Sequence, residues 1–253
     1  MIRDTGKDKM NYAIILSGGI GTRMRRPDCP KQYIDVGGRP VLMYTVETFQ
    51  KNPDVDRIVI VAADEWRPSI RRWMEQEKVS KFESFADPGK TRQESFLSGL
   101  EACMLTSESE KDGVIIHEAV RPLLSSELIS ECLAQLERHD GCMPVLPLND
   151  TIYQSDDGRH LSGLADRSVL FAGQSPESFR LWKFTEINRK TDLQTLRSIR
   201  GASELAFMNG LDMYLIRGED NNFKITTGAD LDRFRGILGM DMLHAAVRVI
   251  FED

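Results

Sequence analysis

Short apolar runs alternate with segments of helical spacing along the first 147 residues, and this alternation constrains the fold more than any other feature. The apolar runs have the length and the residue types of buried strands; they cover residues 12–17, 57–62, 81–86, 113–117 and 142–147. Helices are predicted between them, over residues 40–51, 67–76, 91–103 and 125–139. This order predicts an α/β fold with a mostly parallel sheet that helices cover on both faces. Ligands of such sheets bind outside the carboxyl ends of the strands.

The first predicted strand leads into a glycine loop with the sequence SGGIGTRM, residues 17–24. Three glycines let the backbone come close to a ligand, and consecutive backbone N–H groups form a concavity suited to phosphate. Four positive charges lie within nine residues, on Arg23, Arg25, Arg26 and Lys31. This charge favours a nucleoside triphosphate over a neutral ligand. The loop fits neither the Walker A pattern nor the dinucleotide fingerprint, so glycine spacing alone leaves open an ordinary strand-to-helix turn.

Composition and charge exclude several classes of protein. The chain has 253 residues and a net charge of −6, which argues against broad nucleic-acid binding and makes the basic cluster a local feature. No apolar run approaches the roughly 20 residues that span a membrane, and residues 1–11 are polar, so we expect a flexible N-terminus rather than a signal peptide. The cysteines have no metal-binding or paired spacing, which favours a reducing cytoplasm; they are Cys29, Cys103, Cys132 and Cys142.

The alternating pattern breaks after residue 147. Residues 149–154 and 168–173 have strand character, and they enclose a polar, turn-rich stretch. Two ribbons with so few apolar residues bury little surface on their own. We therefore expect a β-arm over residues 148–173 that packs on a second subunit, with a floppy insertion as the alternative. Beyond it we expect a strand at residues 213–216, a helix at 227–238, and a terminal helix at 241–251 that packs back on the body.

Seven motifs along residues 13–227 occur together and in a family order; they are AIILSGGIGTRM, PKQY, GKTRQES, HEAVRP, NDTI, GQSPESF and NNFKITT. With them the chain resembles the CTP-dependent cytidylyltransferases that activate alcohol phosphates. These include the methylerythritol-phosphate enzyme of isoprenoid synthesis and the ribitol-phosphate enzyme of teichoic-acid and capsule synthesis. The resemblance implies one Rossmann-like nucleotidyltransferase domain over residues 1–253, a dimerising β-arm, and a cytoplasmic homodimer.

The resemblance also implies a reaction and a set of site residues. The acceptor's phosphate oxygen attacks the α-phosphorus of CTP and pyrophosphate leaves, so positioning and cations do most of the catalytic work. The implied catalytic residues are Arg23, Lys31 and Lys224. The implied nucleotide contacts are Ser17, Gly18, Gly19, Gly21, Gly89, Arg92, Ser95 and His117. The implied acceptor contacts are Arg121, Asp150, Thr151, Arg167 and Ser175, with Thr151 and Arg167 reaching across the dimer.

Several positions depart from the family pattern. Glu118 stands where most members have aspartate, and it remains an oxygen donor suited to Mg²⁺. Residues 199–203 read IRGAS where the family often has Thr-Asp-(Asp/Glu)-Ala-Ser, and Lys90 stands where the methylerythritol enzymes often have an acid. The changes at residues 199–203 and at Lys90 touch the surroundings of the acceptor half of the site and leave the CTP half intact.

The identity of the acceptor therefore stays open among three possibilities. They are ribitol 5-phosphate, 2-C-methyl-D-erythritol 4-phosphate, and another phosphorylated alcohol of a capsule or natural-product pathway. The GQSPESF segment is closer to the ribitol-phosphate branch. An inactive nucleotide-binding homologue is the alternative of a different class, and the three catalytic cations argue against it. A related glycosyltransferase would need a DxD motif after the central strand, which His117-Glu118-Ala119 does not supply.

Overall fold

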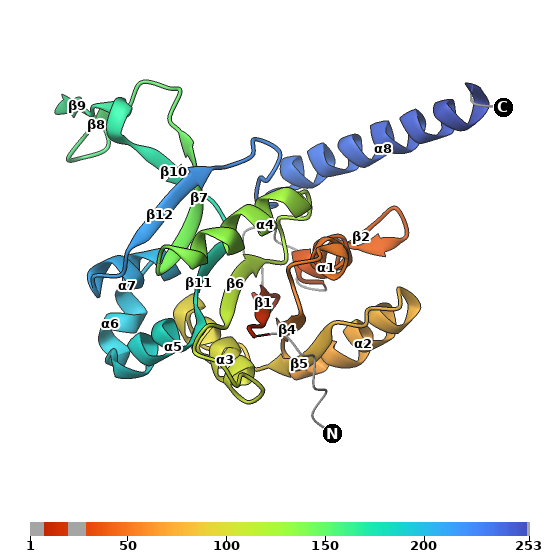
Figure 1. The fold of residues 1–253 in the computed structure, drawn as a ribbon. Coiled ribbons are helices and arrows are strands. Elements are labelled where there is room, and N and C mark those ends of the chain that lie inside the picture. Colours follow the sequence, from red (N-terminus) through yellow and green to blue (C-terminus); the bar gives the residue numbers. More distant parts are fainter. Residues whose placement is uncertain (1–7, 20–28, 252–253) are drawn as a thin grey trace.

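The computed structural model describes residues 8–19 and 29–251, and in this part of the chain eight strands form one sheet (Figure 1). Its hydrogen-bonded order is β10-β7-β11-β6-β1-β4-β5, and β12 also pairs with β7. The strands are β1 (Asn11–Leu16), β4 (Arg57–Val61), β5 (Phe82–Ala86), β6 (Gly113–Glu118), β7 (Gly141–Pro147), β10 (Phe171–Gly173), β11 (Glu177–Arg180) and β12 (Met213–Arg217). A separate short hairpin joins β2 (Asp35–Val36) to β3 (Arg39–Pro40).

The sheet is mostly parallel, as the sequence predicts. Strands β6, β1, β4 and β5 are parallel to one another, and β12 is parallel to β7. All five strands predicted in the first 147 residues are confirmed, each to within one residue at either end. The antiparallel strand β11, which lies between β6 and β7, was not predicted, because Phe179 is its only apolar residue.

Helices cover both faces of the sheet because the strand residues alternate between two hydrophobic clusters. Ala13 and Ile15 of β1 pack on one face, together with residues of α1 (Val41–Lys51), α2 (Arg67–Gln76) and α4 (Ser126–Ala134). Tyr12 and Ile14 pack on the other face, together with residues of α3 (Arg92–Met104), α5 (Leu181–Lys190), α6 (Leu193–Ser198) and α7 (Ala202–Met208). The last three helices were not predicted.

Short polar caps decide where two of the predicted helices begin. Thr91 caps α3 by accepting a hydrogen bond from the backbone N–H of Glu94, and Ser125 caps α4 in the same way. The predicted helix over residues 125–139 ends earlier, at Ala134, and continues as the 3₁₀ turn η4 (Gln135–Glu137). Other 3₁₀ turns are η2 (Lys31–Tyr33), η3 (Asp64–Trp66) and η5 (Arg167–Val169).

The predicted arm is present, but its strands pair differently from the prediction. Strands β8 (Tyr153–Gln154) and β9 (Gly163–Leu164) form a two-stranded hairpin, whereas β10 returns to the main sheet beside β7. The reason is the tight polar turn, in which Asp157 accepts hydrogen bonds from the backbone N–H groups of Arg159 and His160, each at 2.8 Å. Figure 1 shows the arm projecting from the body at the upper left.

The C-terminal prediction of two helices, the second packed back on the body, is wrong. One helix, α8 (Gly228–Phe251), runs through the whole segment, and Figure 1 shows it extending away from the sheet. Gly239, at the expected break, weakens a helix without ending it. Within residues 8–19 and 29–251, none of the helices combines the length and the apolar character needed to cross a membrane.

Candidate active site

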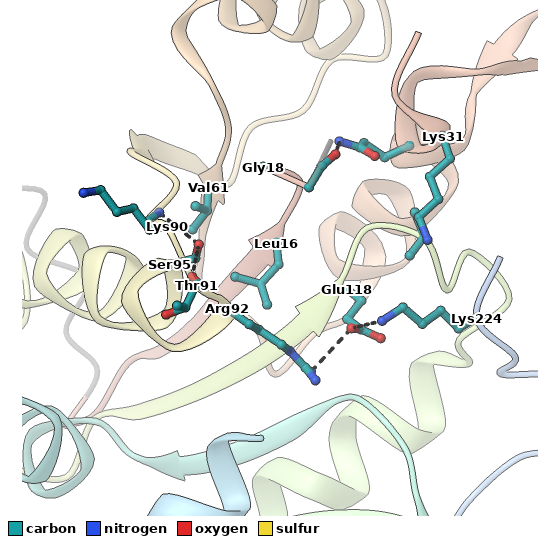
Figure 2. A pocket seen from close by; sticks show the side chains of 14 residues that line it. Leu16, Gly18, Lys31, Val61, Lys90, Thr91, Arg92, Ser95, Glu118 and Lys224 are labelled. Atoms are coloured by element: carbon teal, nitrogen blue, oxygen red, sulfur yellow. Dashed lines mark hydrogen bonds and ion pairs between the residues drawn. The ribbon is translucent and has the colours of Figure 1, made fainter. Parts of the chain in front are cut away.

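A pocket of about 430 Å³ opens at the carboxyl ends of β1, β4 and β6 (Figure 2). This volume falls within the range of small-molecule sites. The segments that line it come from the glycine loop, from η2, from the loop before α3, and from the chain just before α8. Eight of the predicted site residues line it: Gly18, Gly19, Lys31, Gly89, Arg92, Ser95, Glu118 and Lys224. Gly21 and Arg23 lie outside the described residues.

The glycine loop packs closely against the loop that follows β5. The backbone N–H of Ser17 donates to the carbonyl of Val61 at 2.8 Å, which extends the ladder between β1 and β4 into the loop. A Cβ atom placed on Gly18 would lie only 2.4 Å from Cβ of Pro88, whereas a Cβ on Gly19 would meet nothing within 4 Å. Gly18 therefore allows the close approach of the two loops, and Gly19 borders open space in the pocket.

We expect Gly18→Ala and Gly19→Ala to separate packing from ligand binding. Overpacking at Gly18 should lower Tm by about 3–10 °C, while Gly19→Ala should leave Tm within about 1 °C of the wild type. If the nucleotide fills the space beside Gly19, the second variant should still lose CTP affinity by about tenfold, because its methyl group intrudes on the ligand. Differential scanning fluorimetry and calorimetric titration with CTP measure the two effects. Equal Tm values for the two variants would contradict this packing.

The loop before α3 is closed by its own side chains. Ser95 Oγ accepts from the backbone N–H of Gly89 at 3.0 Å and donates to the carbonyl of Thr91 at 3.0 Å (Figure 2). A Cβ on Gly89 would lie 2.2 Å from Cβ of Glu94, so the turn is too tight for a larger residue. The Ser95 hydroxyl thus holds this loop in shape at the rim of the pocket.

Three cations surround the carboxylate of Glu118, at the end of β6. Lys224 Nζ lies 2.6 Å from Oε1, Arg121 Nε lies 3.0 Å from Oε2, and Arg92 Nη2 lies 3.5 Å from Oε1. Figure 2 shows Arg92 and Lys224 approaching Glu118 from opposite sides. Burial would raise the pKa of Glu118, but the charges of Arg92, Lys224 and Arg121 lower it to about 2. Glu177, whose Oε1 lies 3.6 Å from Arg92 Nη2, is a second carboxylate near these three cations, so one positive charge remains in excess, which suits a polyphosphate ligand.

Lys31 and Lys224 both line the pocket although they are 193 positions apart in the sequence. Lys31 Nζ donates to the backbone carbonyl of Ile225 at 2.8 Å. Ile225 is fully buried, and it belongs to a small apolar cluster with Ile34 after η2 and Phe234 of α8. This cluster fixes the chain before α8 beside η2, and so it brings the two lysines together.

His117 and Ser175 lie behind the pocket wall and not on its surface. Because β6 alternates, His117 faces α1, where its ring lies 5.5 Å from that of Phe49, while Glu118 faces the pocket. Both residues, which were predicted to contact the ligands, are buried, with exposed fractions of 0% for His117 and 3% for Ser175. Neither side chain lines the pocket, so the contacts predicted for them with the nucleotide and the acceptor stay predictions.

His117 and Ser175 form a hydrogen-bond network that holds the backbone of Glu118 and Arg121. The His117 Nε2 atom lies 3.1 Å from the carbonyl of Arg121, so this nitrogen carries the proton, and Nδ1 accepts from Ser175 Oγ at 2.7 Å. Ser175 Oγ in turn accepts from the backbone N–H of Glu118 at 3.2 Å. Burial lowers the pKa of His117 to about 4, which keeps the ring neutral in this hydrogen-bond network.

The remaining predicted acceptor residues lie beside Glu118 or on the arm, and none of them lines the pocket. Arg121 is partly buried, pairs with Glu118, and donates to the carbonyl of Asn222 at 2.7 Å. Asp150, Thr151 and Arg167 are exposed on the arm and do not line the pocket of their own chain. Arg167 donates to the backbone carbonyl of Asn149.

Two residues of the site were not predicted, although both lie in recognised motifs. Glu177 is buried, and its Oε1 lies 3.6 Å from Arg92 Nη2, so Arg92 stands between two carboxylates. Its Oε2 accepts from the backbone N–H and the hydroxyl of Ser203, at 2.7 and 2.6 Å, which ties the IRGAS segment to the site. Gln32 is buried beside Lys31 and lines the pocket. The signals that the sequence offered for these two residues were the acid in GQSPESF and the amide in PKQY.

Comparison with known proteins places this chain in a family. The family model described as 2-C-methyl-D-erythritol 4-phosphate cytidylyltransferase (IspD) matches residues 11–240. A ribitol-5-phosphate cytidylyltransferase of Vibrio parahaemolyticus is 30% identical, over 90% of this chain and 96% of that protein. One of Streptococcus agalactiae is 28% identical, over 90% of this chain and 95% of that protein.

Solved structures agree with this placement. The crystal structure of 4-diphosphocytidyl-2C-methyl-D-erythritol synthase from Anaerococcus prevotii superposes with a TM-score of 0.77 and 26% identity, covering 92% of this chain and 97% of that one. The fold is thus that of the nucleotidyltransferases, with a nucleotide-sized pocket at the carboxyl edge of the sheet. The chain belongs to the IspD family of cytidylyltransferases.

Proposed function

We propose that this protein transfers CMP from CTP to the phosphate of a polyol phosphate, with D-ribitol 5-phosphate as the acceptor. The observation that carries the proposal is the cationic cluster of Arg92, Arg121 and Lys224 around Glu118, in a pocket that opens beside the glycine loop. Membership of the family supports CMP transfer to an alcohol phosphate. The curated relatives named as ribitol-5-phosphate cytidylyltransferases, and the GQSPESF segment, support ribitol 5-phosphate as the acceptor.

The reaction needs positioned charge more than it needs acid–base chemistry. An oxygen of the acceptor phosphate forms a bond to the α-phosphorus of CTP, and the bond from that phosphorus to the bridging oxygen breaks. Pyrophosphate leaves with the electron pair. Lys31 and Lys224 would stabilise the charge that builds on the α-phosphate and on the leaving oxygen. With a triphosphate in the pocket, its oxygens would compete with Glu118 for the surrounding cations.

The nucleotide half of the pocket consists largely of backbone. Gly18, Gly19 and Gly89 expose peptide groups there, and peptide groups can donate to and accept from the edge of a base. A cytosine ring offers an N4 amine and an O2 acceptor, and such contacts would favour it over uracil. Arg92, at the first turn of α3, would face the phosphates.

Mg²⁺ fits the donors of this site as a companion of the triphosphate. Among the described residues no group of three or more His, Cys, Asp or Glu side chains is placed to hold a metal ion by itself. Mg²⁺ is commonly held by one or two carboxylates together with substrate phosphates and water. Glu118 is the carboxylate that lines the pocket in this part of the chain, so it would hold the ion. When bound, the ion would supply charge neutralisation on the phosphates.

The acceptor half of the site would be completed by a second subunit. Five large apolar side chains on the arm are 49–69% exposed; they are Tyr153, Leu161, Leu164, Val169 and Phe171. Exposed apolar surface of this kind is typical of an interface. A homodimer that covers it could bring Asp150, Thr151 and Arg167 of one subunit to the pocket of its partner, where an arginine can bind phosphate through two hydrogen bonds.

We expect Arg167→Ala to raise the KM for the acceptor phosphate at least tenfold and to leave the KM for CTP within twofold. The reason is the loss of a charge-assisted contact to the acceptor alone. Arg159→Ala, which removes an exposed arginine from the turn of the same arm, is the matched control and should change neither value. Initial rates at varied concentrations of each substrate provide the measurement.

Co-expression then tests whether the arm reaches across the dimer. In a heterodimer of an Arg167→Ala subunit and a Lys224→Ala subunit, the intact Lys224 and the intact Arg167 lie on different chains. They meet in one site only if the arm of one subunit reaches the pocket of its partner. The heterodimer should therefore recover the wild-type KM for the acceptor. A KM that stays at the Arg167→Ala value would place the arm's contact within its own chain.

A substrate panel tests the proposed function as a whole. Each of the four nucleoside triphosphates is combined with Mg²⁺ and with either D-ribitol 5-phosphate or 2-C-methyl-D-erythritol 4-phosphate, and pyrophosphate release is measured. We expect release with CTP, and a higher kcat/KM with ribitol 5-phosphate. A higher kcat/KM with the methylerythritol phosphate would overturn the choice of acceptor. No release with CTP and either acceptor would overturn the function.

A further inference from the structure

We propose that Gln32 and Tyr33 are positioning residues that hold residues 17–19, the start of the glycine loop, in their nucleotide-binding conformation, an inference that rests on the proposed use of CTP. Both side chains are buried, with exposed fractions of 3% and 5%, and both directly follow Lys31 in η2. The catalytic role proposed for Lys31 explains neither of them. Their hydrogen bonds instead run to the backbone of the glycine loop.

Gln32 holds two carbonyl groups of the loop at once. Its Nε2 donates to the carbonyl of Ser17 at 2.6 Å and to that of Gly19 at 2.8 Å, which uses both amide hydrogens. Carbonyl oxygens that faced the pocket would repel a phosphate. Because C=O and N–H point in opposite directions across a trans peptide, holding the Ser17 carbonyl also sets the direction of the Gly18 N–H. Gln32 therefore fixes the direction of the peptide groups in residues 17–19 as well as their position.

Tyr33 secures the same carbonyl from a second side. Its hydroxyl donates to the carbonyl of Ser17 at 2.9 Å and accepts from Ser17 Oγ at 3.0 Å. Its ring stacks on Trp66 of η3 with the centroids 4.3 Å apart, and the ring of Trp73 in α2 lies 6.0 Å away. Burial raises the pKa of Tyr33, which keeps its hydroxyl protonated and able to donate. The rings of Trp66 and Trp73 thus set the position of the Tyr33 hydroxyl.

One 3₁₀ turn therefore connects both sides of the nucleotide pocket. Lys31 reaches the carbonyl of Ile225, next to Lys224, while Gln32 and Tyr33 hold the glycine loop. A loop freed from η2 would lose its fixed N–H direction, although the lysines and the arm would remain. The effect of losing Gln32 or Tyr33 should therefore fall on CTP binding and not on the acceptor.

The test combines Gln32→Met, Tyr33→Phe and the double variant with calorimetric titration of CTP. Gln32→Met keeps the side-chain length and removes two donors, so we expect the CTP Kd to rise about ten- to a hundredfold. Tyr33→Phe keeps the aromatic stack and removes the hydroxyl, so we expect a rise of about three- to tenfold. Because both side chains hold the Ser17 carbonyl, the double variant should lose less affinity than the product of the two single effects. The KM for the acceptor phosphate should stay within twofold throughout.

Asn52→Leu supplies the control for a merely structural role. Asn52 is a fully buried amide whose Nδ2 donates to the carbonyl of Ser126, at 2.9 Å, where α1 meets α4, and it does not line the pocket. Its loss should lower Tm without changing the CTP Kd. A Gln32→Met or Tyr33→Phe protein that is folded and binds CTP within twofold of the wild type would overturn the inference and leave the proposed function standing. A wild-type protein that does not bind CTP would overturn both.

Discussion

Replacing Lys224 with alanine is expected to lower kcat by about 10²- to 10³-fold, the effect of removing one preorganised charge donor from a transition state. Lys224 Nζ lies 2.6 Å from Glu118 Oε1 at the pocket, and its backbone is held there by the buried side chain of the next residue, Ile225. Arg92 and Arg121 still neutralise Glu118 in the alanine variant, so it should fold and lose mainly the charge of Lys224. Steady-state kinetics at saturating CTP and acceptor measure the loss.

Two further variants sharpen this prediction. Lys224→Arg keeps the charge but replaces a compact ammonium by a planar fork, so it should recover only part of the rate. Lys190→Ala removes an exposed lysine of α5 that pairs with Glu186, and it should leave kcat unchanged. A Lys224→Ala protein with normal kcat and a raised KM for CTP would mean that Lys224 binds ground state and transition state equally well. That outcome would contradict a catalytic role.

Replacing Glu118 with glutamine is expected to lower kcat by about 10²-fold while tightening CTP binding in the absence of Mg²⁺. The amide leaves Arg121 and Lys224 without this counter-charge and leaves Arg92 with Glu177 alone, so the pocket becomes more attractive to a triphosphate. The carboxylate of Glu118 that this variant removes is also the donor proposed for the metal ion. The Mg²⁺ concentration that gives half-maximal rate should therefore rise at least tenfold.

The positive charge left unpaired in Glu118→Gln can also lower the stability of the protein, so this variant needs a Tm measurement beside its kcat. Removing one partner of a buried ion pair is strongly destabilising, so activity must be compared at saturating CTP and together with Tm. Glu118→Asp restores the acid that most family members have at this position, and we expect its kcat to stay within about tenfold of the wild type. Weaker CTP binding with an unchanged Mg²⁺ requirement in Glu118→Gln would contradict the role proposed for this carboxylate.

The first half of the fold could be predicted because local periodicity and burial agree there. Most apolar runs between residues 12 and 147 form largely buried strands, such as β1, β4 and β6, so their sequence alone marks them, whereas the edge strand β5 is only half-buried. Strand β11 has a single apolar residue, Phe179, and is specified by its neighbours β6 and β7. The arm's strands likewise lack a periodic signal, because the turn around Asp157 decides their pairing.

The candidate site divides in a similar way between local and tertiary information. The glycine loop and Glu118 could be placed at strand ends from the sequence. The meeting of Lys31 with the segment before α8 depends on a cluster assembled from distant residues, and a family motif was the only signal for it. Alternation along β6 could not say which of His117 and Glu118 faces the pocket, because that depends on which helices cover each face. The amide of Gln32 stands in the PKQY motif, but the contacts that it makes are visible only in the structure.

The most direct test of CMP transfer is the phosphorus NMR spectrum of the products formed from CTP, Mg²⁺ and D-ribitol 5-phosphate. The account predicts that the acceptor's monophosphate signal is replaced by two mutually coupled diphosphate doublets, with one equivalent of pyrophosphate. This pattern requires a new bond between the acceptor oxygen and the α-phosphorus. Formation of CMP and pyrophosphate with an unchanged monophosphate signal would mean hydrolysis without transfer. That result, or unchanged CTP, would contradict the account.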